Sequence, residues 1–150
     1  MASSNTKNQA VLWLTVLAAP VALGFETLLR SLIFPSEFQL FREFLRPYLT
    51  PFGWALTAVI GLASVAGLSL QARFTRRSLE RLPADRPDQR YGAAFAVFLL
   101  TTALPQIPTL LSTFAYMFGS ELAPVLTGVG ICSIGVVGQA IRVGALSNPE

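Results

Sequence analysis

The sequence contains no histidine and only one cysteine, Cys132. Histidine and cysteine supply most protein ligands for zinc and haem iron, and a lone cysteine can form neither an internal disulfide nor a CxxC redox pair. These metal and redox sites are excluded or nearly so, and we expect no metal and no cofactor. No nucleophile and base stand at a recognisable spacing, so the sequence predicts no catalytic residues.

Charge is scarce as well. Charged residues form 13% of the chain, against about 25% in soluble domains, while 53% of the residues are hydrophobic. The basic excess, 11 Lys and Arg against 8 Asp and Glu, does not indicate a nucleic-acid partner, because the arginines crowd one segment. Those arginines are Arg73, Arg76, Arg77, Arg81, Arg86 and Arg90. The composition predicts that the chain resides in a lipid bilayer.

Long hydrophobic runs are abundant, and they cover residues 10–34, 48–72, 92–118 and 122–145. Each run is near the ~20 residues that an α-helix needs to cross the hydrocarbon core. Glycine and proline inside the runs are compatible with this interpretation, since bilayer helices tolerate both. The sequence therefore predicts an all-α fold in one domain, an integral membrane four-helix bundle made of two tandem transmembrane hairpins.

Two of the segments between the apolar runs have distinctive sequences. Residues 36–46 carry apolar side chains at helical spacing: Phe38, Phe41, Phe44 and Leu45. Charged residues occupy the other face, and Pro47 follows, so we expect a short amphipathic helix at the outer interface that ends there. A docking surface for a partner is the alternative. Residues 73–91 are polar and contain two prolines, which predicts a solvated cytoplasmic loop.

The distribution of lysine and arginine predicts the orientation. Lys7, Arg142 and the arginines of 73–91 fall on the side of the predicted bundle that holds both termini. The opposite side carries Arg30, Arg42 and Arg46. Because cytoplasmic loops are enriched in Lys and Arg, both termini should be cytoplasmic.

The first 24 residues permit a second interpretation, a cleaved signal peptide with Lys7 as its charged end. The apolar pattern continues past any plausible cleavage point to Phe34. This continuation favours an uncut first helix.

The chain contains a possible internal repeat. GLSLQAR at 67–73 resembles GVVGQAIR at 135–142, with Gly, Gln and Ala at matching spacing, and Pro20 can be aligned with Pro105. A direct repeat of two hairpins would give this pattern. Chance recurrence of Gly, Pro and Ala in bilayer sequences explains it equally well.

Two charges interrupt the first apolar run. Glu26 and Arg30 share a helix face, and Glu26 stands four residues before Arg30, the better order for a helical ion pair. Arg30 can extend to the outer surface. Glu26 lies about 6 Å from the midplane, where a carboxylate costs about 2.5–3.5 kcal/mol unless it is paired or protonated. Glu26 is therefore the main functional candidate, either for ion or proton handling or as a structural partner of Arg30.

The third apolar run carries a polar stripe made of Thr102, Gln106, Thr109 and Thr113. Pro105 and Pro108 leave backbone carbonyls of this helix without donors. With Glu26 and Arg30, the stripe and these carbonyls form a candidate path for an ion or solute. In the alternative interpretation, the threonines bond to their own helix and Gln106 bonds to a neighbouring helix.

The second and fourth runs carry faces of small residues, which let helix backbones approach closely. The predicted helix-packing residues are Gly53, Thr57, Gly61, Gly67, Gly128 and Gly135. Cys132 belongs to the same face and is expected to be a small buried filler. We expect these faces to pack within or between protomers and not to bind a ligand.

The sequence thus predicts a small non-enzymatic membrane protein that forms a homo-oligomer or joins other membrane subunits, with the lipid bilayer as its surroundings. Passage of an ion, proton or small solute along the polar path is one version of this hypothesis. A purely structural subunit with a buried Glu26–Arg30 pair is the alternative. A lipid-acting membrane enzyme is the least favoured.

Overall fold

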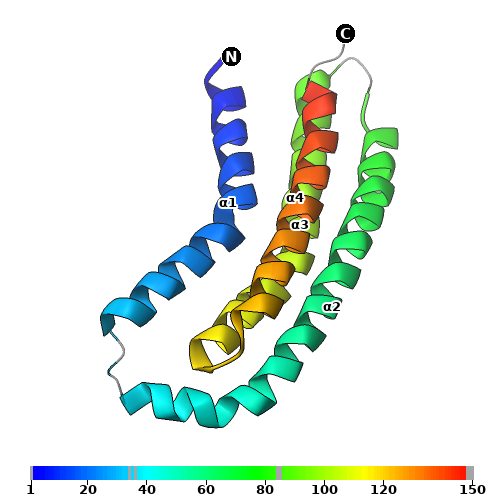
Figure 1. The fold of residues 1–150 in the computed structure, drawn as a ribbon. Coiled ribbons are helices and arrows are strands. Elements are labelled where there is room, and N and C mark those ends of the chain that lie inside the picture. Colours follow the sequence, from blue (N-terminus) through cyan, green and yellow to red (C-terminus); the bar gives the residue numbers. More distant parts are fainter. Residues whose placement is uncertain (1, 34, 36, 84–85, 148–150) are drawn as a thin grey trace.

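The chain is all-helical in the part that the structure describes. The structure is a computed structural model, which describes residues 2–33, 35, 37–83 and 86–147. These residues form α1 (Ala2–Ile33), α2 (Glu37–Glu80), α3 (Pro87–Phe118) and α4 (Leu122–Ser147), shown in Figure 1. All four helices are long and apolar enough to cross a membrane.

Helices α2, α3 and α4 pack against one another, and α1 packs against α3 and α4. Within the described residues, α1 and α2 make no contact, so the first predicted hairpin is not packed in the way that α3 and α4 are. The core lies where α2, α3 and α4 meet, around Ile60, Phe98 and Val125, all fully buried. Both ends of the helical chain and the α2–α3 connection lie at one end of the molecule (Figure 1).

Many polar side chains are buried beside the apolar core, and large apolar side chains cover the outside. Leu62, Leu100 and Ile134 are 74%, 69% and 76% exposed. Several polar side chains are at most 1% exposed, among them Thr102, Thr109, Ser112, Thr113 and Gln139. A protein folded in water would bury the large apolar residues first. This distribution, together with the four long apolar helices, suggests an integral membrane protein.

Helix α2 does not end at Pro47, contrary to the prediction. It continues from Glu37 to Glu80 with Pro47 and Pro51 inside it, and its first part turns sharply away from the rest of the helix (Figure 1). A proline removes one backbone donor and bends a helix, which need not stop when the neighbouring structure holds the bend. We call residues 37–46 the α2 arm. The predicted separate helix 36–46 is thus a bent extension of α2, and α1 likewise changes direction near its middle and contains Pro20.

The connection between α2 and α3 is shorter than the predicted 73–91 loop. Helix α2 continues to Glu80, and α3 begins at Pro87, which occupies the first turn, where proline is tolerated. Arginine is a good helix former, and Arg76 Nε donates to Glu80 Oε1 at 3.0 Å across one helical turn. Local helix propensity therefore extends α2 through much of the arginine-rich segment.

Candidate functional site

Two side-chain hydrogen bonds join α1 to α3 in the apolar interior. Thr113 Oγ1 on α3 lies 2.9 Å from Glu26 Oε1 on α1. Gln106 Nε2 on α3 donates to the Thr15 carbonyl oxygen on α1 at 2.9 Å. The polar faces predicted for these two helices therefore contact each other at two positions along their length.

The surroundings of Glu26 are short of hydrogen-bond donors. The residue is 9% exposed, and in the described part of the chain its Oε2 has no partner. Thr113 Oγ1 also lies 2.8 Å from the Leu110 carbonyl oxygen, yet a hydroxyl has one proton to donate. The Thr113 hydroxyl is therefore shared between the Leu110 carbonyl oxygen and Glu26 Oε1, as the Thr57 hydroxyl is shared between two carbonyl oxygens.

The predicted ion pair between Glu26 and Arg30 is not formed. Among the described side chains, the ion pairs are Arg46–Glu121 and Arg76–Glu80. The Arg30 guanidinium instead lies over the Tyr116 ring, with Cζ 4.9 Å from the ring centroid, a favourable cation–π position. Pairing of charges four residues apart is a rule for residues within one helix. Here α3 supplies each residue with a different partner, Thr113 for Glu26 and Tyr116 for Arg30.

Two threonines of the α3 stripe bond within their own helix. Thr102 Oγ1 lies 3.0 Å from the Phe98 carbonyl oxygen, and Thr109 Oγ1 lies 2.6 Å from that of Pro105. These bonds within one helix, and the bond from Gln106 to α1, match the alternative interpretation of the stripe. Of the predicted path residues, only Arg30 lines one of the cavities described for this part of the chain.

The predicted packing residues lie mostly between α2 and α4. Four glycines face close neighbours there: Gly53, Gly67, Gly128 and Gly135. A Cβ at Gly53 would lie 2.6 Å from Ser120 Oγ. Thr57 belongs to the same contact, since its Oγ1 donates to the Pro124 carbonyl oxygen at 2.8 Å. Gly61 differs from the others because an added Cβ would meet no described atom within 4 Å.

The two repeat-like segments cross each other in the interior. Gln71 and Gln139 are 2% and 0% exposed, and Gln71 Nε2 donates to the Gln139 carbonyl oxygen at 2.9 Å. The Gln139 side chain lies against Gly67, and Thr101 Oγ1 is 3.4 Å from its Oε1. This buried polar crossing was not among the predicted site residues. The matching GLSLQAR and GVVGQAIR segments were the signal that pointed to it.

Arg42 was predicted to lie on the charged face of the 36–46 helix, yet it is buried, at 7% exposure. Its Nε donates to the Met117 carbonyl oxygen and its second amino group to that of Tyr116, each at 3.1 Å. Carbonyls at the end of a helix lack intrahelical donors and carry partial negative charge. Arg42 thus caps the C-terminal end of α3 from the α2 arm.

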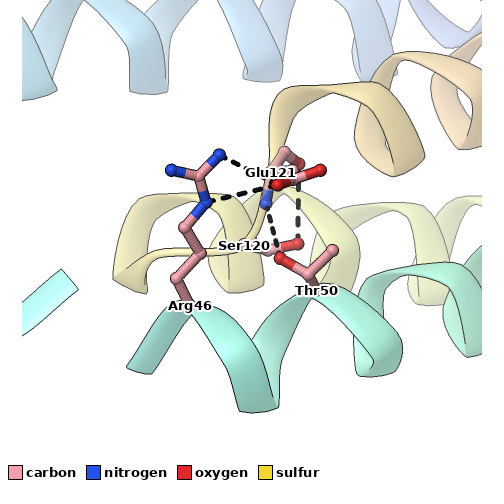
Figure 2. Close-up of polar contacts among 4 residues, drawn as sticks. All are labelled: Arg46, Thr50, Ser120 and Glu121. Atoms are coloured by element: carbon pink, nitrogen blue, oxygen red, sulfur yellow. Dashed lines mark hydrogen bonds and ion pairs between the residues drawn. The ribbon is translucent and has the colours of Figure 1, made fainter. Parts of the chain in front are cut away.

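Further contacts fasten the start of α2 to the α3–α4 turn (Figure 2). Arg46 pairs with Glu121 Oε1 at 2.9 Å, and the Glu121 backbone N–H donates to Thr50 Oγ1 at 3.3 Å. Both ion-pair side chains are largely exposed, so the pair contributes at most about 1 kcal/mol in water. A cavity of about 300 Å³ lies beside this contact, lined by Arg30, Arg42 and Arg46 among others.

Within the residues that the structure describes, no group of three or more His, Cys, Asp or Glu side chains could hold a metal ion. Comparisons with protein-family models, curated proteins and solved structures found no match. The function must therefore be inferred from the interior polar contacts and the outer surface of the four helices.

Proposed function

We propose that the chain is a small integral membrane protein without enzymatic activity, a four-helix bundle that assembles with further copies of itself or with other membrane subunits. The exposed apolar surface of α1 supports this proposal more than any other feature. Trp13, Leu14 and Val21 are 63%, 68% and 63% exposed, on a helix that contacts only α3 and α4 among the described residues. A second α1 packed on this surface would bury it in a homo-oligomer.

The orientation is part of the same proposal. The arginine-rich segment and both ends of the helical chain lie at one end of the molecule, and the α2 arm lies at the other (Figure 1). Short cytoplasmic loops carry the excess of arginine, which supports cytoplasmic termini. On the α2 arm, Leu40 and Phe44 are 73% and 70% exposed, as expected for a helix that lies in the outer interface.

Single cysteines in a Cys132→Ser background test both parts of this proposal. We expect a membrane-impermeant maleimide to label Leu40→Cys in intact cells and Leu82→Cys, in the α2–α3 connection, only in inverted vesicles. On mild oxidation, Leu14→Cys or Val21→Cys on α1 should give a disulfide-linked dimer. Leu62→Cys, equally exposed but on α2, is the matched control and should stay monomeric.

Two outcomes would contradict the proposal. Labelling of Leu40→Cys and Leu82→Cys from the same side would rule out the four-span orientation. Equal cross-linking of the α1 and α2 variants would indicate random collision in the bilayer and would remove the support for assembly through α1.

Proton handling at Glu26 is a second candidate function. It is supported by the burial of Glu26, which is 9% exposed, and by its Oε2, which has no partner among the described residues. An acid buried among transmembrane helices is a common element of proton pathways. The cavity lined by Arg30 begins one helical turn from Glu26, toward the α2 arm.

Infrared difference spectroscopy on the purified protein in bilayers tests this candidate. As the pH is lowered from about 9 to about 5, we expect the carboxyl C=O stretch of a protonated acid to appear in the original chain and to be absent in Glu26→Gln. The band should shift in Thr113→Val, because that variant keeps the shape of threonine and removes the hydrogen bond. If no such band appears over this range, Glu26 is ionised throughout and the proton-handling candidate is wrong.

A further inference from the structure

The largest cavity described for this chain lies between α2, α3 and α4, at the end of the molecule that holds the chain termini. It encloses about 520 Å³, within the usual range of about 300–1,000 Å³ for ligand sites. Polar and charged residues from all three helices line it, principally Gln71, Thr75, Arg76, Arg90 and Arg142. None of these residues belongs to the Glu26 site or to the exposed surface of α1.

Two polar atoms of this cavity lack hydrogen-bond partners in the described part of the chain. Gln71 is 2% exposed, and its Nε2 is fixed by the bond to the Gln139 carbonyl oxygen. Its Oε1 has no partner, nor has the buried hydroxyl of Thr75. Buried polar atoms are almost always hydrogen-bonded, so an unpaired side-chain oxygen in a residue that lines a cavity indicates a missing donor.

The charges around the cavity are predominantly positive. Arg76 is paired with Glu80, and one amino group of Arg142 donates to the Leu68 carbonyl oxygen at 2.9 Å. The Arg90 guanidinium makes no hydrogen bond or ion pair with any described residue. Three arginines with one described acid favour an anionic ligand, and guanidinium groups bind phosphate oxygens particularly well.

We propose that this cavity binds the phosphate-containing head group of an anionic phospholipid that carries free hydroxyls. The phosphate contacts Arg90 and Arg142, and head-group hydroxyls bond to Gln71 Oε1 and to the Thr75 hydroxyl. Leu79 and Val143 provide an apolar wall for the glycerol and the first acyl carbons. The choice of a lipid over a soluble phosphate ester rests on the proposed bilayer orientation, which places this cavity at the cytoplasmic leaflet, where anionic lipids concentrate.

Native mass spectrometry of the purified full-length protein, titrated with lipid, tests this site. The probes are phosphatidylglycerol, which has both charge and hydroxyls, phosphatidylmethanol, which has the charge alone, and phosphatidylcholine. We expect affinity to fall in that order. Arg90→Gln should weaken phosphatidylglycerol binding about tenfold, the effect of losing one hydrogen bond between charged groups. Arg86→Gln removes the same charge one helical turn earlier, does not line the cavity, and should change binding less than about twofold because salt screens a distant charge.

Thr75→Val separates recognition of the hydroxyls from recognition of the charge. This variant should weaken binding of phosphatidylglycerol and leave phosphatidylmethanol binding unchanged. Equal losses in Arg90→Gln and Arg86→Gln would overturn the site, because the attraction would then be diffuse. Competition by soluble glycerol 3-phosphate at millimolar concentration would overturn the assignment to a lipid and leave the cysteine-labelling test of the orientation unaffected.

Discussion

Replacing Gly119 by alanine is expected to lower the free energy of unfolding by about 3 kcal/mol, and to reduce the yield of folded protein. Gly119 ends α3 with φ of 134°, a backbone conformation that costs other residues about 1–3 kcal/mol. An alanine Cβ would also lie 2.5 Å from the Arg42 carbonyl oxygen, which belongs to the backbone of the α2 arm and cannot move aside alone. Unfolding in detergent followed by circular dichroism measures the change.

Gly130→Ala is the matched control for this experiment. Gly130 lies within α4, where an added Cβ meets no described atom within 4 Å. Alanine is favoured over glycine in a helix by about 1 kcal/mol, so this variant should be as stable as the original chain or more stable. Equal stability of Gly119→Ala and Gly130→Ala would show that the backbone of the α2 arm is not in close contact with Gly119.

Gly67→Leu is expected to be the most damaging substitution within a helix. Pro105 leaves the Thr101 carbonyl without its intrahelical donor, and this carbonyl faces Gly67. A Cβ at Gly67 would lie 3.1 Å from that oxygen and 2.5 Å from Gln139 Nε2, and Gln139 is completely buried. Adding bulk to a packed core lowers the free energy of unfolding by about 1–3 kcal/mol even when the neighbouring side chains can shift. At Gly67 the helices α2, α3 and α4 would have to separate.

Gly61→Leu makes the same chemical change on the same helix at a position with open space. It should fold at normal yield, since leucine suits a lipid-facing surface. Thermal unfolding of both variants in detergent gives the comparison. Similar melting temperatures would mean that α2, α3 and α4 are not in close contact at Gly67.

The sequence predicted the helices well, and it predicted the ends of α2 and the start of α3 poorly. Composition and run length are properties of whole segments, so they identified four apolar helices correctly. The end predicted at Pro47 was wrong because a proline signal is local, while Arg42 holds the bent α2 arm through carbonyls on α3. No pattern within residues 36–47 could reveal that partner.

The interior polar contacts were predicted in part. The positions of Glu26, Gln106 and Thr113 on inward faces followed from helical periodicity, and the structure brings these faces together. The specific partners did not follow, because a spacing rule selects Arg30 for Glu26 without knowledge of α3. Gln71 entered the sequence analysis only as part of the GLSLQAR segment, and its place at a cavity depends on helices that are distant in sequence.

The contacts made by Arg42 affect the order of events during biosynthesis. Its hydrogen bond to Met117 spans 75 residues. At a synthesis rate of about 5–20 residues per second, the end of α3 follows Arg42 out of the ribosome after about 4–15 s. During that interval Arg42, which is buried in the folded protein, has no α3 carbonyls to bind. The α2 arm can therefore dock only after α3 has been made. A truncated nascent chain that stops before Tyr116 should therefore leave Arg42 accessible to modifying reagents, although α1 and α2 are already complete.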